Sequence, residues 1–198
     1  MIDSYYRQVY QKTCIDPILP FCNKLSPQII TLISCLLGLI VCPLVIFDFP
    51  WIAFLVLMLS GFLDTLDGSL ARYLNLVTSK GAALDIVCDR IVEFSVILGL
   101  FFVDINVRAI PSVVMLGSIL LCVTTFLVVG IFVENQSMKS FFYSPGLIER
   151  GEAFIFFSIM ILFPTTFIIA AYLFSALTIS TAMFRFWEFM KVNLDEPS

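Results

Sequence analysis

Six long apolar segments follow one another along this chain of 198 residues, and they limit its fold more than any other feature. A helix needs about 20 apolar residues to cross the ~30 Å hydrocarbon core of a bilayer, and several segments approach that length. Hydrophobic residues make up 60% of the sequence, more than a soluble domain of this size can bury. The segments lie at 28–47, 51–73, 82–103, 111–133, 146–163 and 165–188. We therefore expect an all-α membrane protein with six transmembrane helices.

The first 26 residues have a different character from the apolar segments. Charged side chains such as Arg7 and Lys12 alternate there with tyrosines and aliphatic residues, and Pro17 and Pro20 interrupt the stretch. This pattern is typical of an amphipathic helix and turn that lie on the membrane surface. The expected organisation is an interfacial N-terminal segment at 1–26, a six-helix membrane domain at 27–190 and a short cytoplasmic tail at 191–198.

Four aspartates, Asp64, Asp67, Asp85 and Asp89, lie inside or beside the second and third apolar segments. Residues three or four apart share a helix face, so each pair projects together from its own helix. Ionised carboxylates are costly at membrane depth unless a cation neutralises them. The chain has no histidine, and carboxylate oxygens favour hard ions such as Mg²⁺, Mn²⁺ or Ca²⁺. We expect the four acids to converge on two divalent cations that share ligands.

Small residues and one arginine stand at fixed distances from these acids. Gly68 and Ala71 leave one helix face without bulk, which allows a nucleotide to approach the backbone. Arg72 supplies a permanent positive charge for a diphosphate, and Gly81 precedes the second pair of acids. The alternative is ordinary helix packing, which in membranes also favours Gly and Ala.

Together these residues form the pattern D-x2-D-G-x2-A-R-x8-G-x3-D-x3-D, from Asp64 to Asp89. At all eight fixed positions the chain resembles the CDP-alcohol phosphotransferases, membrane enzymes that make phospholipid headgroups. The resemblance implies that an alcohol hydroxyl attacks the β-phosphate of a CDP-linked lipid donor, usually CDP-diacylglycerol, and that CMP is released. It also implies a homodimer.

The resemblance assigns roles to individual residues. Asp64, Asp67 and Asp85 are then the main ligands of two divalent cations, Mg²⁺ or Mn²⁺. Asp89 also contacts metal and is the catalytic base toward the hydroxyl. The residues expected to bind the nucleotide of the donor are Thr31, Asp67, Gly68, Ala71, Arg72 and Gly81. Thr31 belongs to a stretch that is similar to the family's Pro-Asn-x-x-Thr entry to the first helix, although Gln28 stands where the family has Asn.

A second charged region, residues 139–152, precedes the fifth helix. Family members that use phosphorylated acceptors carry a sequence like E-R-x-x-R near here, but Ala153 replaces the second arginine. Either the acceptor is less anionic, or Lys139 and Arg150 alone hold its phosphate, or these cations only pair with neighbouring glutamates. Glycerol 3-phosphate is our first hypothesis for the acceptor, with inositol, its phosphate, serine and choline as alternatives.

Nine of the eleven basic residues fall on one side of the membrane if the N-terminus is cytoplasmic. Such an excess marks the cytoplasmic side. Arg108 falls outside, and Arg90 lies within a span, where an ion pair with Glu93 or a contact with lipid headgroups is the favoured interpretation. We expect a bacterial inner-membrane protein with both termini and the active site facing the cytoplasm. Its partners are membrane lipids, the lipid donor and a small alcohol. A net charge of −4 without a basic tract argues against nucleic acid.

Two other classes of protein also place acids in membranes. Intramembrane prenyltransferases bind diphosphate through metal, but their aspartate clusters are about a hundred residues apart, whereas these four lie close together. A cation channel or transporter would not require the glycine, alanine and arginine of the pattern. Release of CMP from a CDP-lipid would separate these alternatives from the transferase.

Overall fold

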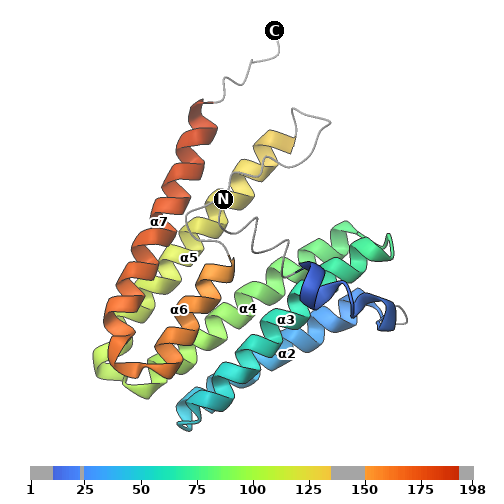
Figure 1. Ribbon diagram of the computed structural model, residues 1–198. Helices are drawn as coiled ribbons and strands as arrows, with labels where there is room; N and C mark the ends of the chain where they lie inside the picture. The colour runs from blue at the N-terminus through green and yellow to red at the C-terminus, as the bar shows by residue number, and fades with distance from the viewer. Residues whose placement is uncertain (1–10, 23–24, 135–149, 192–198) are drawn as a thin grey trace. The chain divides into compact units, whose positions relative to one another are not determined.

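The computed structural model describes residues 11–22, 25–134 and 150–191, and every regular element in them is helical. Figure 1 shows the six α-helices of this part of the chain. They are α2 (Pro27–Ile46), α3 (Pro50–Tyr73), α4 (Ser79–Val103), α5 (Ile105–Glu134), α6 (Arg150–Leu162) and α7 (Phe167–Lys191). Short helical turns lie at Gln11–Ile15, Leu19–Phe21 and Pro164–Thr166. The all-α class expected from the sequence is confirmed.

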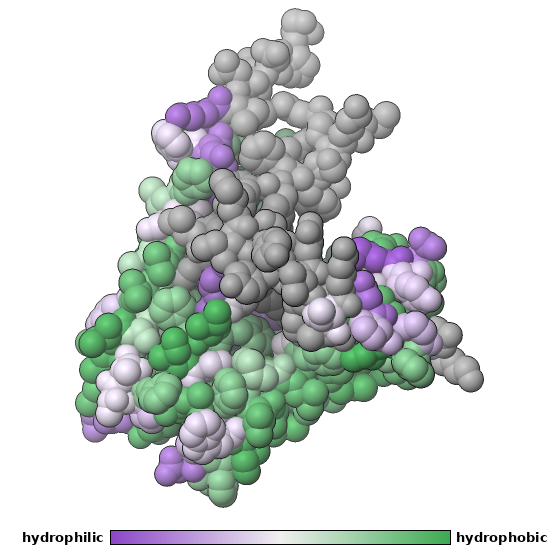
Figure 2. Space-filling view, viewed as in Figure 1, coloured by the Kyte–Doolittle hydropathy of each residue, from purple (hydrophilic) through white to green (hydrophobic). Residues whose placement is uncertain are grey.

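Four stretches are long and apolar enough to cross a membrane. They are Pro27–Ile46, Pro50–Tyr73, Ile105–Phe132 and Pro164–Lys191. The third expected span, 82–103, lies in α4, where Asp85, Asp89, Arg90 and Glu93 lower its hydropathy, and α6 has only 13 residues. Large apolar side chains nevertheless cover much of the visible surface in Figure 2, which is typical of a protein surrounded by lipid.

Helix α5 begins six residues earlier than the apolar pattern predicts, because Asp104 acts as its N-terminal cap. The Val107 N–H donates to the Asp104 carboxylate at 3.2 Å, and the Arg108 N–H donates to the Asp104 carbonyl at 2.9 Å. Pro111 lies inside the helix instead of preceding it. The expected start of this segment at residue 111 is therefore wrong.

The chain divides into two compact units, residues 1–99 and 100–198. In the first unit, α2 packs along α3 and two serines join them reciprocally. Ser34 Oγ donates to the Ser60 carbonyl and Ser60 Oγ donates to the Ser34 carbonyl, both at 2.8 Å. Ser95 of α4 donates to the Leu39 carbonyl of α2 at 3.3 Å. Small residues thus allow the three helix backbones to approach closely.

Two residues with positive φ form the turns of this unit. Asp48 (φ 60°) follows α2 and Asn75 (φ 56°) follows α3. After α3, Leu76 N–H donates to the Ala71 carbonyl at 2.8 Å and Asn75 N–H to the Arg72 carbonyl at 3.2 Å, the bond pattern of a Schellman motif. Asn and Asp tolerate this left-handed conformation better than most residues. The Asn75 turn lets α4 begin within a few residues of the end of α3.

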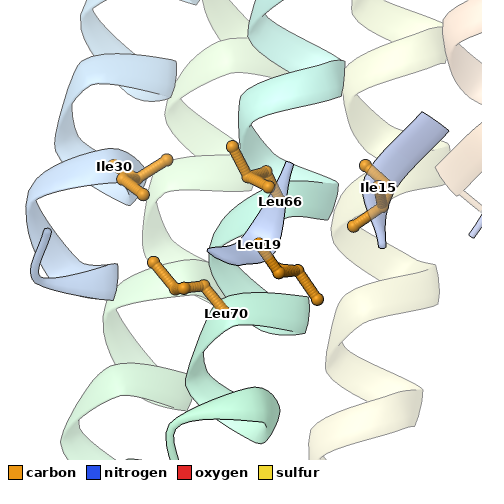
Figure 3. Close-up of a cluster of buried hydrophobic side chains, with 5 residues drawn as sticks. All are labelled: Ile15, Leu19, Ile30, Leu66 and Leu70. Carbon is orange, nitrogen blue, oxygen red and sulfur yellow. The ribbon is translucent and has the colours of Figure 1, made fainter. Parts of the chain in front are cut away.

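Residues 11–22 are attached to α2 and α3 by a small apolar cluster. Figure 3 shows Ile15 and Leu19 facing Ile30, Leu66 and Leu70, and all five are buried. The opposite side of this segment is exposed, with Phe21 as its most accessible large side chain. Most of the predicted interfacial helix precedes residue 11 and lies outside the described residues.

In the second unit, α7 packs along α5 and contacts α6. Arg108 is buried at the end of this unit, where its guanidinium donates to the Leu100 carbonyl at 3.0 Å and to the Pro164 carbonyl at 3.3 Å. It also lies 4.5 Å from the centre of the Phe167 ring. The side chain thus ties the start of α5 to the turn before α7.

Gly99 allows a close contact between α4 and α2, so Gly99→Ala should destabilise the protein. A Cβ atom there would lie 2.9 Å from the Cys42 Cα and 3.0 Å from its carbonyl oxygen, and backbone cannot yield as a side chain can. We expect the free energy of unfolding to fall by about 1–3 kcal/mol, the usual cost of overpacking. Thermal melting in detergent measures it. Gly117→Ala is the matched control, because no atom lies within 4 Å of its added Cβ. Equal melting temperatures for the two variants would contradict this account of the helix contact.

Candidate active site

Three carboxylates from two helices meet in the first unit. Asp64 and Asp67 lie one turn apart on α3, and Asp85 lies on α4. One oxygen from each lies within 4.8 Å of the other two. Asp64 and Asp67 are only 8% and 4% exposed, so this negative charge is largely removed from water. The Asn75 turn produces the arrangement, because it brings the start of α4 back alongside the end of α3.

The donor set fits a divalent cation. All three ligating groups are carboxylates, which are the hard oxygen donors that Mg²⁺ and Mn²⁺ prefer. Three negative groups at this separation repel one another strongly when buried, and a divalent cation would offset that repulsion. The expectation that acids from the two halves of the pattern converge is thus met for three of the four.

Asp89 lies one turn beyond Asp85 on α4 and is not part of the three-carboxylate group. Its side chain is 13% exposed, and its Oδ2 lies 4.0 Å from Arg90 Nη2. Arg90 Nη1 lies 2.6 Å from Glu93 Oε2, which confirms the ion pair predicted for it. That Asp89 contacts metal and acts as the base stays a prediction.

A cavity of about 450 Å³ opens beside Asp67 and Asp85. Six of the eight fixed positions of the sequence pattern line it: Asp67, Gly68, Ala71, Arg72, Gly81 and Asp85. Thr31 lines it from the start of α2, where its hydroxyl donates to the Pro27 carbonyl at 3.1 Å. All the residues expected to bind the nucleotide therefore border one cavity, and a cavity of this size suits a nucleotide-sized ligand.

The two glycines of the pattern are explained by different features of the structure. A Cβ on Gly68 would meet only Arg72 Nη1, at an ordinary 3.6 Å, so protein packing does not demand glycine there and its small size serves the cavity. The Gly81 N–H donates to Thr78 Oγ1 at 3.1 Å, the N-terminal cap of α4. A Cβ on Gly81 would lie 3.2 Å from that hydroxyl, so this glycine also serves the cap.

Arg72 presents its charge to the cavity. The side chain is exposed, and Nη2 donates to Ser69 Oγ at 3.1 Å. Within the described ranges, no carboxylate forms an ion pair with this guanidinium. Its remaining N–H groups are thus available to an anion.

Several residues that line the cavity were not predicted from the sequence. Ser26, Pro27, Leu76, Val77, Thr78 and Ala82 also border the cavity. Gln28, which replaces the family's asparagine, borders it too. Thr78 had a sequence signal, since a threonine three residues before a glycine amide at a helix start is a cap pattern. The proposed acceptor residues are not placed: Lys139 lies outside the described residues, and for Arg150, the first residue of α6, only the backbone is described.

Residues 24–187 match the family described as CDP-alcohol phosphatidyltransferase. The chain belongs to this family. It is accordingly an integral membrane enzyme of the phosphatidyltransferase class, and the match covers both units of the structure.

Two individual proteins are similar to this chain in sequence. The inner membrane protein YnjF of Escherichia coli (strain K12) is 28% identical over 186 residues, which cover 87% of this chain and 90% of that protein. An uncharacterized protein of Aquifex aeolicus (strain VF5) is 37% identical over 83 residues, or 41% of this chain and 42% of that one.

Solved structures share the fold at low identity. The crystal structure of Mycobacterium tuberculosis phosphatidylinositol phosphate synthase with CDP-DAG bound has a TM-score of 0.69 and 20% identity, and the match covers 93% of this chain and 98% of that one. The structure of the same synthase in complex with manganese and citrate has a TM-score of 0.74 and 19% identity, with 92% of each chain covered.

Removing one carboxylate from the cluster should weaken metal binding directly. We expect Asp64→Asn, Asp67→Asn and Asp85→Asn each to lower the affinity for Mn²⁺ at least about tenfold. Mutation of a residue that only hydrogen-bonds to a metal ligand already lowers metal affinity about 10- to 100-fold, and these residues would be the ligands themselves. Isothermal titration of the purified protein measures this without any assay of activity. Asp48→Asn is the matched control, because Asp48 lies in the α2–α3 turn and asparagine suits its positive φ. Unchanged Mn²⁺ affinity in all three cluster variants would rule out the site.

Proposed function

We propose that this protein transfers a phosphatidyl group from CDP-diacylglycerol to the hydroxyl of a small alcohol and releases CMP. The observation that carries the proposal is the coincidence of two features: a cavity of about 450 Å³, and a group of three carboxylates at its edge, two of which are buried. Six fixed positions of the family pattern supply its wall. The synthase that shares the fold was crystallised with CDP-DAG in one case and with manganese in another, which supports the same donor and the same type of metal here.

Asp64, Asp67 and Asp85 would hold the metal, and Asp89 would be a fourth ligand. The proposed site binds two divalent ions, Mg²⁺ or Mn²⁺. When bound, these ions would neutralise charge on the diphosphate and make its phosphorus more electrophilic. Gly68 and Ala71 leave room for the nucleotide along α3, and Thr31 and Gly81 border it from α2 and α4.

The transfer itself is a substitution at one phosphorus atom. The acceptor oxygen forms a bond to the phosphorus that carries the diacylglycerol, and the bond from that phosphorus to the bridging oxygen breaks. The bridging oxygen leaves with CMP. Asp89 takes the proton of the acceptor hydroxyl, and Arg72 pairs with the negative charge of the diphosphate and of the departing CMP.

The acceptor and its pocket form a separate part of the proposal. We propose glycerol 3-phosphate as the acceptor, with Lys139 and Arg150 holding its phosphate. The motivation is sequence alone: these are cations on the side of the membrane where the aspartates are expected. Inositol, its phosphate, serine and choline are the competing acceptors.

The membrane arrangement is likewise part of the proposal. Six spans within residues 27–190 would form the catalytic domain, with residues 1–26 at the interface and 191–198 as a cytoplasmic tail. Both termini and the active site would face the cytoplasm of a bacterial inner membrane, and the protein would act as a homodimer. The distribution of basic residues supports this orientation, and the described inner-membrane relative supports this location.

The direct test is release of CMP by purified protein given CDP-diacylglycerol, a divalent cation and one alcohol at a time. We expect CMP to appear with a single acceptor or a small set of related ones, and to require Mg²⁺ or Mn²⁺. Asp89→Asn keeps the shape of the side chain but removes its charge, and should lower the rate at least about 100-fold. If wild-type protein releases no CMP with any alcohol of the panel, the proposed reaction is wrong. Near-normal turnover by Asp89→Asn would refute only the role of that residue.

Arg150→Ala tests whether the acceptor is held by charge. If glycerol 3-phosphate is the acceptor, its KM should rise about 10- to 150-fold, because loss of a charged hydrogen bond to phosphate costs roughly 1.5–3 kcal/mol. The KM for CDP-diacylglycerol should stay nearly constant. An unchanged KM for glycerol 3-phosphate would exclude this role, and pairing of Arg150 with Glu149 or Glu152 would then be preferred.

A further inference from the structure

Ser69 contacts Arg72 although the family pattern leaves its position unspecified. It follows Gly68 on α3, is 3% exposed, and its Oγ accepts a hydrogen bond from Arg72 Nη2 at 3.1 Å. Among the described residues it is the hydrogen-bond acceptor of this guanidinium. The hydroxyl is thus in a position to decide where the charge of Arg72 points.

The direction of this hydrogen bond is fixed by chemistry. A serine hydroxyl has one proton and two lone pairs, and a guanidinium can only donate. Two acceptors compete for the Ser69 proton: the Thr65 carbonyl at 2.9 Å and Gln11 Oε1 at 3.0 Å. Whichever acceptor takes the proton, a lone pair of Ser69 remains directed to Arg72.

Gln11 connects this network to the chain before α2. Its other amide atom, Nε2, donates to Asp16 Oδ1 at 2.9 Å, which orients the amide so that its oxygen faces Ser69. Ile15 and Leu19 of the same segment pack against Leu66 and Leu70, on the turns of α3 beside Ser69 (Figure 3). Residues 11–22 therefore cover the Ser69 hydroxyl and exclude water that would compete for its lone pairs.

Orienting Arg72 has a use at this site. Arginine has a long flexible side chain, and an exposed one samples many rotamers. When Ser69 holds Nη2 of Arg72, the other N–H groups of the guanidinium are directed into the cavity, where Gly68 leaves space for them. Fixing a binding group before the ligand arrives reduces the ordering cost of binding.

We infer that Ser69 is a positioning residue for Arg72, that residues 11–22 act as its cover, and that the oriented guanidinium recognises the diphosphate of the CDP-linked donor. The inference rests on the proposed function and deepens it, because it assigns donor recognition to a contact outside the sequence pattern. Ser69 itself would not touch the donor.

The first test is Ser69→Ala, measured by steady-state kinetics and by the Kd of CDP in the presence of Mn²⁺. We expect the KM for CDP-diacylglycerol and the Kd of CDP to rise about 3- to 10-fold, the usual value of one hydrogen bond, while the KM of the alcohol stays the same. In an Arg72→Lys background, Ser69→Ala should change the Kd of CDP less than about twofold, since the interaction that it removes is already absent. Ser175→Ala is the matched control, because Ser175 is also buried and bonds to its own helix but belongs to α7.

A purely structural role for Ser69 predicts a different result. It would lower the melting temperature and affect both substrates alike, and the loss would persist in the Arg72→Lys background. The pair Ser69→Thr and Ser69→Val separates shape from chemistry, since the two side chains have the same shape and only threonine keeps the hydroxyl. Threonine should bind CDP at least about threefold more tightly than valine.

The outcomes are distinguishable from failure of the proposed function. Wild-type protein that releases CMP, combined with equal CDP affinity in wild type and Ser69→Ala or in the Thr and Val variants, overturns the inference and leaves the function intact. Equal losses in the wild-type and Arg72→Lys backgrounds also overturn it. Wild-type protein that neither releases CMP nor binds CDP overturns the proposed function, and the inference with it.

Discussion

The convergence of three carboxylates within an apolar bundle is the constraint on which the rest of this structure depends. Asp64, Asp67 and Asp85 approach within 4.8 Å although buried like charges repel. The short connection between α3 and α4, with Asn75 in the left-handed region, holds the two helices in that register. Reciprocal bonds between Ser34 and Ser60 join α3 to α2, and Ser95 of α4 donates to the Leu39 carbonyl of α2, so both helices that carry the acids are tied to α2. The contacts between the helices hold the three acids together, and a divalent cation would neutralise their charge.

The cavity follows from the same arrangement of helices. It lies where the end of α3, the start of α4 and the start of α2 meet, so each helix contributes residues from one terminus. The two glycines and Ala71 leave space there, and Arg72 brings the opposite charge to the ligand expected beside the acids. Residues 11–22 pack on α2 and α3, which carry part of the cavity lining, through the Ile15 and Leu19 contacts (Figure 3). Every described residue that lines the cavity belongs to the first unit of the chain.

The sequence predicted the helical class and the convergence of Asp64, Asp67 and Asp85, because both depend on local pattern. Apolar length marks helices such as α2, and the spacing of the aspartates places them on helix faces that can meet. The start of α5 was missed because a cap at Asp104 outweighs the usual boundary signal of Pro111. The role of Ser69 was missed because it depends on Gln11, which is distant in sequence and comes close only through tertiary packing.

The central claim is that a phosphatidyl group moves intact from a CDP-lipid to an alcohol. The most direct measurement follows radioactive phosphorus placed in the donor at the phosphate next to the diacylglycerol, with the preferred alcohol and Mn²⁺ present. The account predicts that the label appears in a new phospholipid that contains the alcohol, in equal amount to the CMP released, and that the CMP itself is unlabelled. Label recovered only as phosphatidic acid would show hydrolysis instead of transfer, and label recovered in CDP would show cleavage between the labelled phosphorus and the diacylglycerol oxygen. Either result would contradict the proposed reaction.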